Sequence, residues 1–253
     1  MERSTSIGSL RGFTLIETIF VIALVAVLAT LGITLGARAV AASEKATCTS
    51  NLRQLGSVVQ AYLNDHDGFY FPYREKSAEG TMWYFGLETH GGGAEGEREL
   101  DRSAGPLHQY VEETGGIEIC PGFDYGDALY KPKFKGASWA YGYNWHLGGG
   151  WSGRHPMNVA QLSNRSQVIV FADCAQANNF QAPATADKPM LEEFYLINEE
   201  FKTIHFRHNH AANFLFADGH VEARKMLDGT RDERLKSEHL GRITPSGSLE
   251  FLK

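Results

Sequence analysis

The sequence predicts an α+β fold: a long amino-terminal helix, half of it transmembrane, packed on a small antiparallel sheet with long loops. Four observations predict it. Residues 18–37 carry no charge, and in residues 43–66 apolar side chains recur at three- and four-residue steps. The second half of the chain contains short apolar and alternating runs that are typical of strands. The 27 glycines among 253 residues indicate many turns and loops.

The amino-terminal segment has the length of a membrane span. Residues 1–12 are polar, with Arg3 and Arg11 as basic residues, and the uncharged residues 18–37 follow closely. Twenty helical residues at ~1.5 Å each extend about 30 Å, which is the thickness of the hydrocarbon core of a bilayer. One carboxylate, Glu17, lies at the edge of this segment. We therefore expect a helix that crosses a membrane once.

Residues 12–17 read Gly-Phe-Thr-Leu-Ile-Glu and resemble the type IV prepilin signature, which pilins share with type II secretion pseudopilins. In that family a peptidase cuts after the glycine and methylates the new first residue, which implies a cut between Gly12 and Phe13. The resemblance implies a pilin-like fold and a structural subunit of a type IV pilus-like or type II secretion pseudopilus filament, without enzymatic activity or cofactor.

The resemblance also implies partners and a location. The partners are the prepilin peptidase and methyltransferase, other pilin or pseudopilin subunits, the inner-membrane assembly machinery and membrane lipid. The location is the bacterial inner membrane, with the head in the periplasm or in an extracellular filament.

The formal net charge of −6 argues against general binding of nucleic acid.

Glu17 needs a compensating partner, because a carboxylate costs about 2.5–3.5 kcal/mol at the bilayer centre and less near its edge. After cleavage the α-amine of Phe13 would stand four residues before Glu17, on the same helix face. Glu17 would pair with this amine or with the amine of a neighbouring subunit, and the resemblance implies the second arrangement. Since no such amine exists before cleavage, processing should precede assembly.

Other interpretations remain open. An ordinary secretory signal would end at a site such as Ala39-Val40-Ala41, although its apolar region spans only 7–15 residues and residues 13–37 are longer. An uncleaved signal anchor explains the length but not the residues around Glu17. In another class of function, the chain is a membrane-anchored extracytoplasmic binding module that never polymerises and binds a ligand such as a glycan.

The helix sets the domain boundaries. Residues 1–12 form a leader, 13–42 the transmembrane and assembly half of the helix, and 43–253 the globular head, in which 43–66 continue the helix as an amphipathic segment. Asp67-Gly68 ends it. The apolar face of the continuation consists of Leu52, Leu55, Val59, Tyr62 and Leu63. Residues 44–55 resemble the same stretch of a large pilin-like group.

The rest of the head is less regular. Residues 91–116 are expected to be mainly loop, with a short helix around 107–113. Alternating aromatics in 137–151 and the apolar run 167–173 predict strands. We expect residues 175–193 to form an irregular surface excursion. The compact basic cluster, Lys131, Lys133 and Lys135, is expected to be a solvated loop.

Three cysteines, Cys48, Cys120 and Cys174, would lie on the oxidising side of the membrane if the prepilin interpretation holds. Similar sequences carry cysteines in the contexts of Cys48 and Cys120, so the resemblance implies a disulfide between them. It would close a long loop and stabilise the fold by about 4 kcal/mol. Cys174 would be free or intermolecular. Spacing alone does not settle the connectivity, and the alternative is that none is bridged.

Residues 213–216 and 220–224 predict a hairpin, with Ala217-Asp218-Gly219 as its turn. His208, nine intervening residues, then Asp218 and Gly219 resemble a motif near the end of many prepilin-type proteins. We expect a structural role, in which Asp218 caps the turn and His208 bonds a nearby backbone group.

A metal site is the alternative interpretation of this hairpin. Its potential zinc ligands are His205, His208, His210, Asp218 and His220. However, the Asp-His continuation of the zinc-hydrolase pattern is missing, because two alanines follow His210. A calcium ion, which some pseudopilins hold, would instead take oxygen atoms from Asp173, Asp218 and backbone carbonyls.

Overall fold

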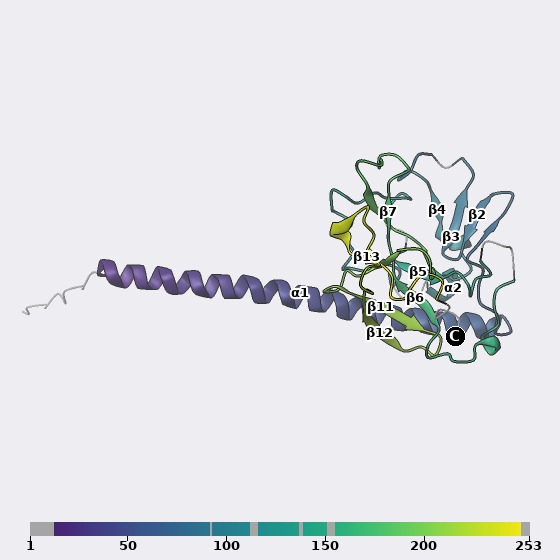
Figure 1. The fold of residues 1–253 in the computed structure, drawn as a ribbon, viewed down its shortest axis with the longest axis horizontal. Coiled ribbons are helices and arrows are strands. Elements are labelled where there is room, and N and C mark those ends of the chain that lie inside the picture. The colour runs from purple at the N-terminus through teal and green to yellow at the C-terminus, as the bar shows by residue number, and fades with distance from the viewer. Residues whose placement is uncertain (1–12, 92, 112–115, 137–138, 151–154, 249–253) are drawn as a thin grey trace, which may run out of the picture. The chain divides into compact units, whose positions relative to one another are not determined.

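The computed structural model describes residues 13–91, 93–111, 116–136, 139–150 and 155–248. It has one long helix and several mainly antiparallel sheets, which is the predicted α+β class (Figure 1). By its internal contacts the chain divides into two compact units, Met1–Ala42 and Ser43–Lys253.

Helix α1 spans Leu15–Asp65 without interruption, as predicted. Residues 13–42 are all exposed, and the most apolar window of the helix has a mean hydropathy of 2.6. By length and composition this helix can cross a membrane once, because its exposed side chains are the kind that hydrocarbon solvates.

The carboxyl-terminal end of α1 is closed by main-chain bonds. The Gly68 N–H donates to the Leu63 carbonyl (2.8 Å), while Asp67 and Gly68 take φ angles of 52° and 79°. This left-handed pair turns the chain back after the helix, a conformation that glycine adopts without steric cost. His66 Nδ1 lies 2.8 Å from the Tyr62 carbonyl and adds a side-chain contact.

The buried face of α1 begins at Cys48 and contains all five predicted apolar residues. Its members are Cys48, Asn51, Leu52, Leu55, Gly56, Val58, Val59, Tyr62 and Leu63. A Cβ atom at Gly56 would lie 3.0 Å from Leu215 Cδ1, so the helix approaches the central sheet closely at this point.

The central sheet of the head has five strands in the order β12-β11-β6-β5-β9. Their bounds are Val221–Lys225, Ala211–Phe216, Ile169–Asp173, Tyr141–Asn144 and Leu196–Ile197. Neighbours are antiparallel except for the parallel pair β5 and β9. The predicted strand 167–173 and the predicted hairpin are confirmed as β6 and as β11 with β12.

A four-stranded antiparallel meander, β1 to β4, was not predicted (Figure 1). Its strands are Arg74–Lys76, Gly80–Trp83, Gly86–Thr89 and Leu100–Asp101. Short helices are η1 (Arg102–Ala104), α2 (His108–Val111), η3 (Val159–Gln161) and η4 (Lys236–Glu238). Helix α2 confirms the predicted short helix.

The prediction of an irregular surface excursion at 175–193 holds for residues 179–189, which are outside the named strands and largely exposed, but is wrong for the two ends. Strands β7 (Gln176–Asn178) and β8 (Met190–Glu192) pair there as an antiparallel sheet, and Glu192 is fully buried. Another small sheet joins β10 (Ile204–His205) to β13 (Leu240–Gly241).

The lysine cluster is likewise not a solvated loop. Lys131 is buried, and its Nζ donates to Glu95 Oε2 (2.7 Å) and Glu192 Oε1 (2.8 Å). The Lys133 ammonium lies over the ring of Trp83, 5.1 Å from its centroid, and burial lowers the pKa of this lysine. Of the three lysines only Lys135 is exposed.

Candidate functional site

The first turn of α1 holds Glu17 in a capping box with Thr14. The main-chain N–H and the hydroxyl of Thr14 both donate to Glu17 Oε2 at 2.8 Å. In return, the Glu17 main-chain N–H donates to Thr14 Oγ1 at 3.3 Å. This reciprocal arrangement satisfies main-chain donors that a helix start would otherwise leave unpaired. The Thr-x-x-Glu spacing signals it in the sequence, although Thr14 was not among the predicted functional residues.

Glu17 keeps one oxygen outside this box, because the bonds to Thr14 engage Oε2 and not Oε1. Phe13 stands one residue before the cap, and its side chain is exposed. Gly12, the other residue of the predicted cleavage site, lies outside the part of the chain that the structure describes. The arrangement therefore allows Glu17 to cap its own helix and still accept a bond from a second donor.

The carboxyl-terminal motif forms the two turns that flank β11. Before the strand, His208 and Ala211 exchange main-chain bonds of 3.0 and 3.1 Å, and the central residues Asn209 and His210 take φ angles of 52° and 61°. Two consecutive left-handed residues are typical of a tight two-residue hairpin turn. His208 and His210 therefore lie in a turn and not on a strand.

After the strand, Asp218 caps the second turn. Its Oδ1 accepts from the His220 main-chain N–H (3.1 Å) and lies 2.6 Å from His220 Nδ1, while Gly219 takes a φ angle of 90°. The six residues of β11 separate His208 from this turn by about 20 Å at ~3.4 Å per residue. The two ends of the motif thus serve different turns and cannot share one ligand.

The His208 ring is buried against a disulfide. Cys48 on α1 is bonded to Cys120, with Cα atoms 5.3 Å apart, and both cysteines are fully buried. His208 Nε2 lies 3.4 Å from Cys120 Sγ and 3.4 Å from Asp173 Oδ2. The ring therefore contacts side chains, and not the backbone group that we expected.

Asp173 is the charged centre of this buried cluster. Its Oδ2 accepts from the Asn213 main-chain N–H at 2.7 Å, and its Oδ1 lies 3.5 Å from Arg207 Nη2. The same Arg207 nitrogen donates to the Ala140 carbonyl at 2.8 Å. Arg207 was not among the predicted residues, and only the fold brings it to Asp173.

The fold does not bring together either of the two sets of potential metal ligands, zinc or calcium, that the sequence offered. Asp218 and His220 lie at the far end of β11 from His208, so the zinc-hydrolase set is split. Asp173 pairs with Asn213 at the His208 end, so it cannot share a calcium ion with Asp218.

Gly122 packs so closely against the His208 ring that a larger residue would not fit. A Cβ atom at this position would lie 2.7 Å from His208 Cε1. We expect Gly122→Ala to lower the free energy of unfolding by about 1–3 kcal/mol, because the added Cβ would collide with a buried ring that already contacts Cys120 and Asp173. In a His208→Ala background the same change should cost much less, which chemical denaturation of the four variants would measure as a coupling.

Gly126→Ala is the matched control for this cycle. Its added Cβ would meet only Asp124 Oδ1, at 3.4 Å, which is ordinary contact. If Gly122→Ala lowers the free energy of unfolding by the same amount with and without the His208 ring, the close packing of Gly122 against that ring is contradicted.

Cys174 is the free cysteine, and it is fully buried. Burial raises the pKa of its thiol to about 12, so the thiol stays protonated and unreactive at pH 8. We expect the native chain to resist alkylation, the denatured chain to take one label, and the denatured and reduced chain to take three. Mass spectrometry counts the labels, and rapid labelling of the native chain would contradict the burial.

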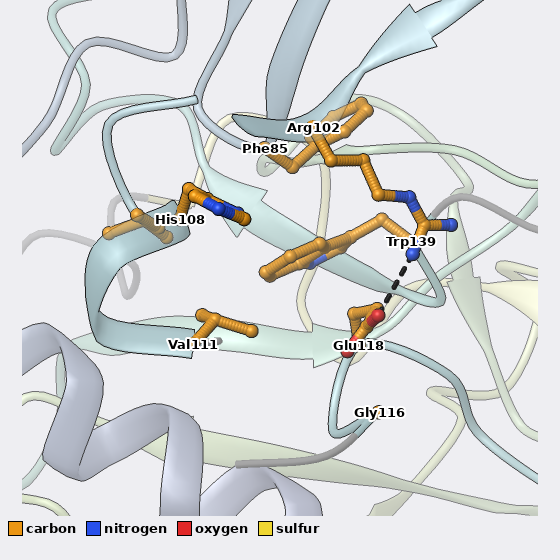
Figure 2. Close-up of a pocket in the computed structure, with 8 residues that line it drawn as sticks. Phe85, Arg102, His108, Val111, Gly116, Glu118 and Trp139 are labelled. Atoms are coloured by element: carbon orange, nitrogen blue, oxygen red, sulfur yellow. Dashed lines mark hydrogen bonds and ion pairs between the residues drawn. The ribbon is translucent and has the colours of Figure 1, made fainter. Parts of the chain in front are cut away.

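The head also contains a cavity of about 160 Å³ between α2, η1 and the segment before β5 (Figure 2). It is lined by Phe85, Arg102, Leu107, His108, Val111, Gly116, Glu118 and Trp139. Arg102 Nη1 donates to Glu118 Oε1 at 2.9 Å, so the opposite charges are paired within the wall. A cavity of about 150 Å³ can hold a benzene-sized ring. The aromatic and aliphatic walls suit a small neutral group.

No protein-family model, curated protein or solved structure matches the chain. The residues themselves must therefore carry any functional assignment.

Proposed function

We propose that the chain is a structural subunit of a type IV pilus-like or type II secretion pseudopilus filament, processed by a prepilin peptidase after Gly12. The observation that carries the proposal is Glu17, the sole carboxylate of residues 13–42. It directly precedes the uncharged residues 18–37 of a helix that is long enough to span a membrane, and one of its oxygens stays outside the capping box.

The physical reason for assembly lies in this carboxylate and in the apolar surface that follows it. A helix segment whose exposed side chains are mostly apolar, as in residues 18–37, is stable in lipid or against other apolar helices. The α-amine that cleavage would create at Phe13 supplies a cation for Glu17. If that cation belongs to a neighbouring copy, the ion pair fixes the stagger between two helices, and its attraction offsets part of the desolvation cost of the two charges.

The test of processing is the mature amino terminus. We expect mass spectrometry of the chain, produced in a bacterium with a prepilin peptidase, to show a first residue of N-methylated Phe13. Gly12→Leu should leave the leader attached. A start beyond Ala41 would support the secretory-signal alternative, and an intact leader in the wild-type chain would support the signal anchor.

A second candidate function, the anchored binding module, is favoured by the cavity of Figure 2. The two candidates make opposite predictions for Glu17. A module that never polymerises needs no charge at this position, so its function should survive Glu17→Gln.

A further inference from the structure

The side chains around the disulfide have the identity and spacing of a zinc site. The sulfur atoms of Cys48 and Cys120 and a ring nitrogen of His208 lie within 4.8 Å of one another, and all three residues are buried. Asp173 Oδ2 lies 3.4 Å from His208 Nε2. We propose that the dithiol form of the head binds one Zn²⁺ through Cys48, Cys120 and His208, with Asp173 as the fourth ligand.

The two distances at His208 Nε2 fit tetrahedral coordination. Ligand atoms bound to zinc at ~2.0–2.3 Å in a tetrahedron lie about 3.3–3.8 Å from each other. The two edges that meet at His208 Nε2 are 3.4 Å each, one to Cys120 Sγ and one to Asp173 Oδ2. Two changes complete the site. The sulfurs, about 2 Å apart as a disulfide, separate once the bond is broken, and the Asp173 carboxylate moves toward them, because it does not lie within 4.8 Å of both sulfurs and the His208 ring nitrogen in the disulfide form.

The charges also balance. Two thiolates, one carboxylate and Zn²⁺ together carry one negative charge. Arg207 lies 3.5 Å from Asp173 Oδ1 and supplies the compensating positive charge. A buried metal site without net charge avoids most of the desolvation penalty of an isolated ion.

The chemistry conserves atoms and electrons. In the newly made chain both cysteines are thiols, and zinc binding releases the two thiol protons without a change of oxidation state. In the purified chain a phosphine reductant breaks the disulfide: it takes up the oxygen of one water molecule, and the two sulfurs receive the hydrogens. Zinc and disulfide are therefore mutually exclusive ways to join α1 to the segment at Cys120.

The experiment uses the full chain in detergent micelles, reduced anaerobically with a phosphine, with thiols counted before metal is added. We expect the reduced chain to take one equivalent of Zn²⁺ and the oxidised chain none. Co²⁺ in its place should give the sulfur-to-metal charge-transfer band and visible absorption of a four-coordinate site. X-ray absorption of the zinc form should show two sulfur ligands at ~2.3 Å and two nitrogen or oxygen ligands at ~2.0–2.1 Å.

The chain offers matched controls. Loss of a residue that only hydrogen-bonds to a zinc ligand typically weakens zinc binding by about 10–100-fold. Loss of a ligand itself should cost more, so we expect Cys48→Ser, Cys120→Ser or His208→Asn to weaken binding by more than about 100-fold. Cys174→Ser and His210→Asn remove the same chemical groups outside the cluster and should keep one equivalent. Full affinity in the Cys120→Ser chain, equal binding by the oxidised chain, or a wild-type spectrum without two sulfurs would overturn the proposal. The wild-type spectra decide it even if a ligand variant fails to fold.

Discussion

Replacing Glu17 with glutamine should abolish incorporation of the chain into filaments while its helix start stays intact. Glutamine is accepted at this position of a capping box, so the bonds with Thr14 can persist. The negative charge is lost, and with it the ion pair that we propose to the α-amine of a neighbouring subunit. The measurement is the amount of chain in sheared surface filaments, compared with the amount retained in the membrane, for equally processed variants.

Thr14→Ala is the complementary variant. It removes the hydroxyl of the capping box and costs about 1 kcal/mol at the helix start, but it keeps the charge of Glu17. We therefore expect the Thr14→Ala chain to enter filaments and the Glu17→Gln chain to remain in the membrane. The reverse result would assign Glu17 a local capping role only and would remove the main support for a filament subunit.

Removing the disulfide with the pair Cys48→Ala and Cys120→Ala should lower the free energy of unfolding of the head by about 4 kcal/mol. The bond links residues 72 positions apart, so its loss gives the unfolded chain a large additional conformational freedom. This is a large share of the 5–15 kcal/mol that is typical of a domain. Guanidinium unfolding of the full chain in detergent, followed by tryptophan fluorescence, measures it.

Cys174→Ala is the control for the lost sulfur atoms. It removes a buried sulfur that closes no loop, and it should cost about 1 kcal/mol. If the double variant loses no more than about twice that amount, the bridge contributes no loop constraint and its atoms act only by packing.

The elements predicted from the sequence are those with long or local signals. Helix α1 repeats its apolar period over many turns, and the hairpin around Asp218 and Gly219 is encoded within about a dozen residues. Strand β6 is a continuous apolar run that is buried on both faces. Each of these elements can be predicted from its own residues, without information about segments that are distant in the sequence.

The failures come from contacts between distant segments. Strands β1 to β4 have two to four residues, too few for a period to show. Lys131 is buried because Glu95 and Glu192 meet it from 36 and 61 positions away. The same limit applies to the cluster at His208, where only the fold brings Asp173 and Cys120 to one ring nitrogen.

The position of the disulfide also has a mechanical consequence. Cys48 is the first buried residue of α1, so tension applied along the stem meets a covalent bond before it reaches the apolar contacts from Leu52 to Leu63. The disulfide then transmits the force to the chain at Cys120, so the buried turns of α1 do not separate one by one from the rest of the head. If the chain forms a filament, as we propose, heads joined by the disulfide would unfold under tension less readily than heads held by packing alone.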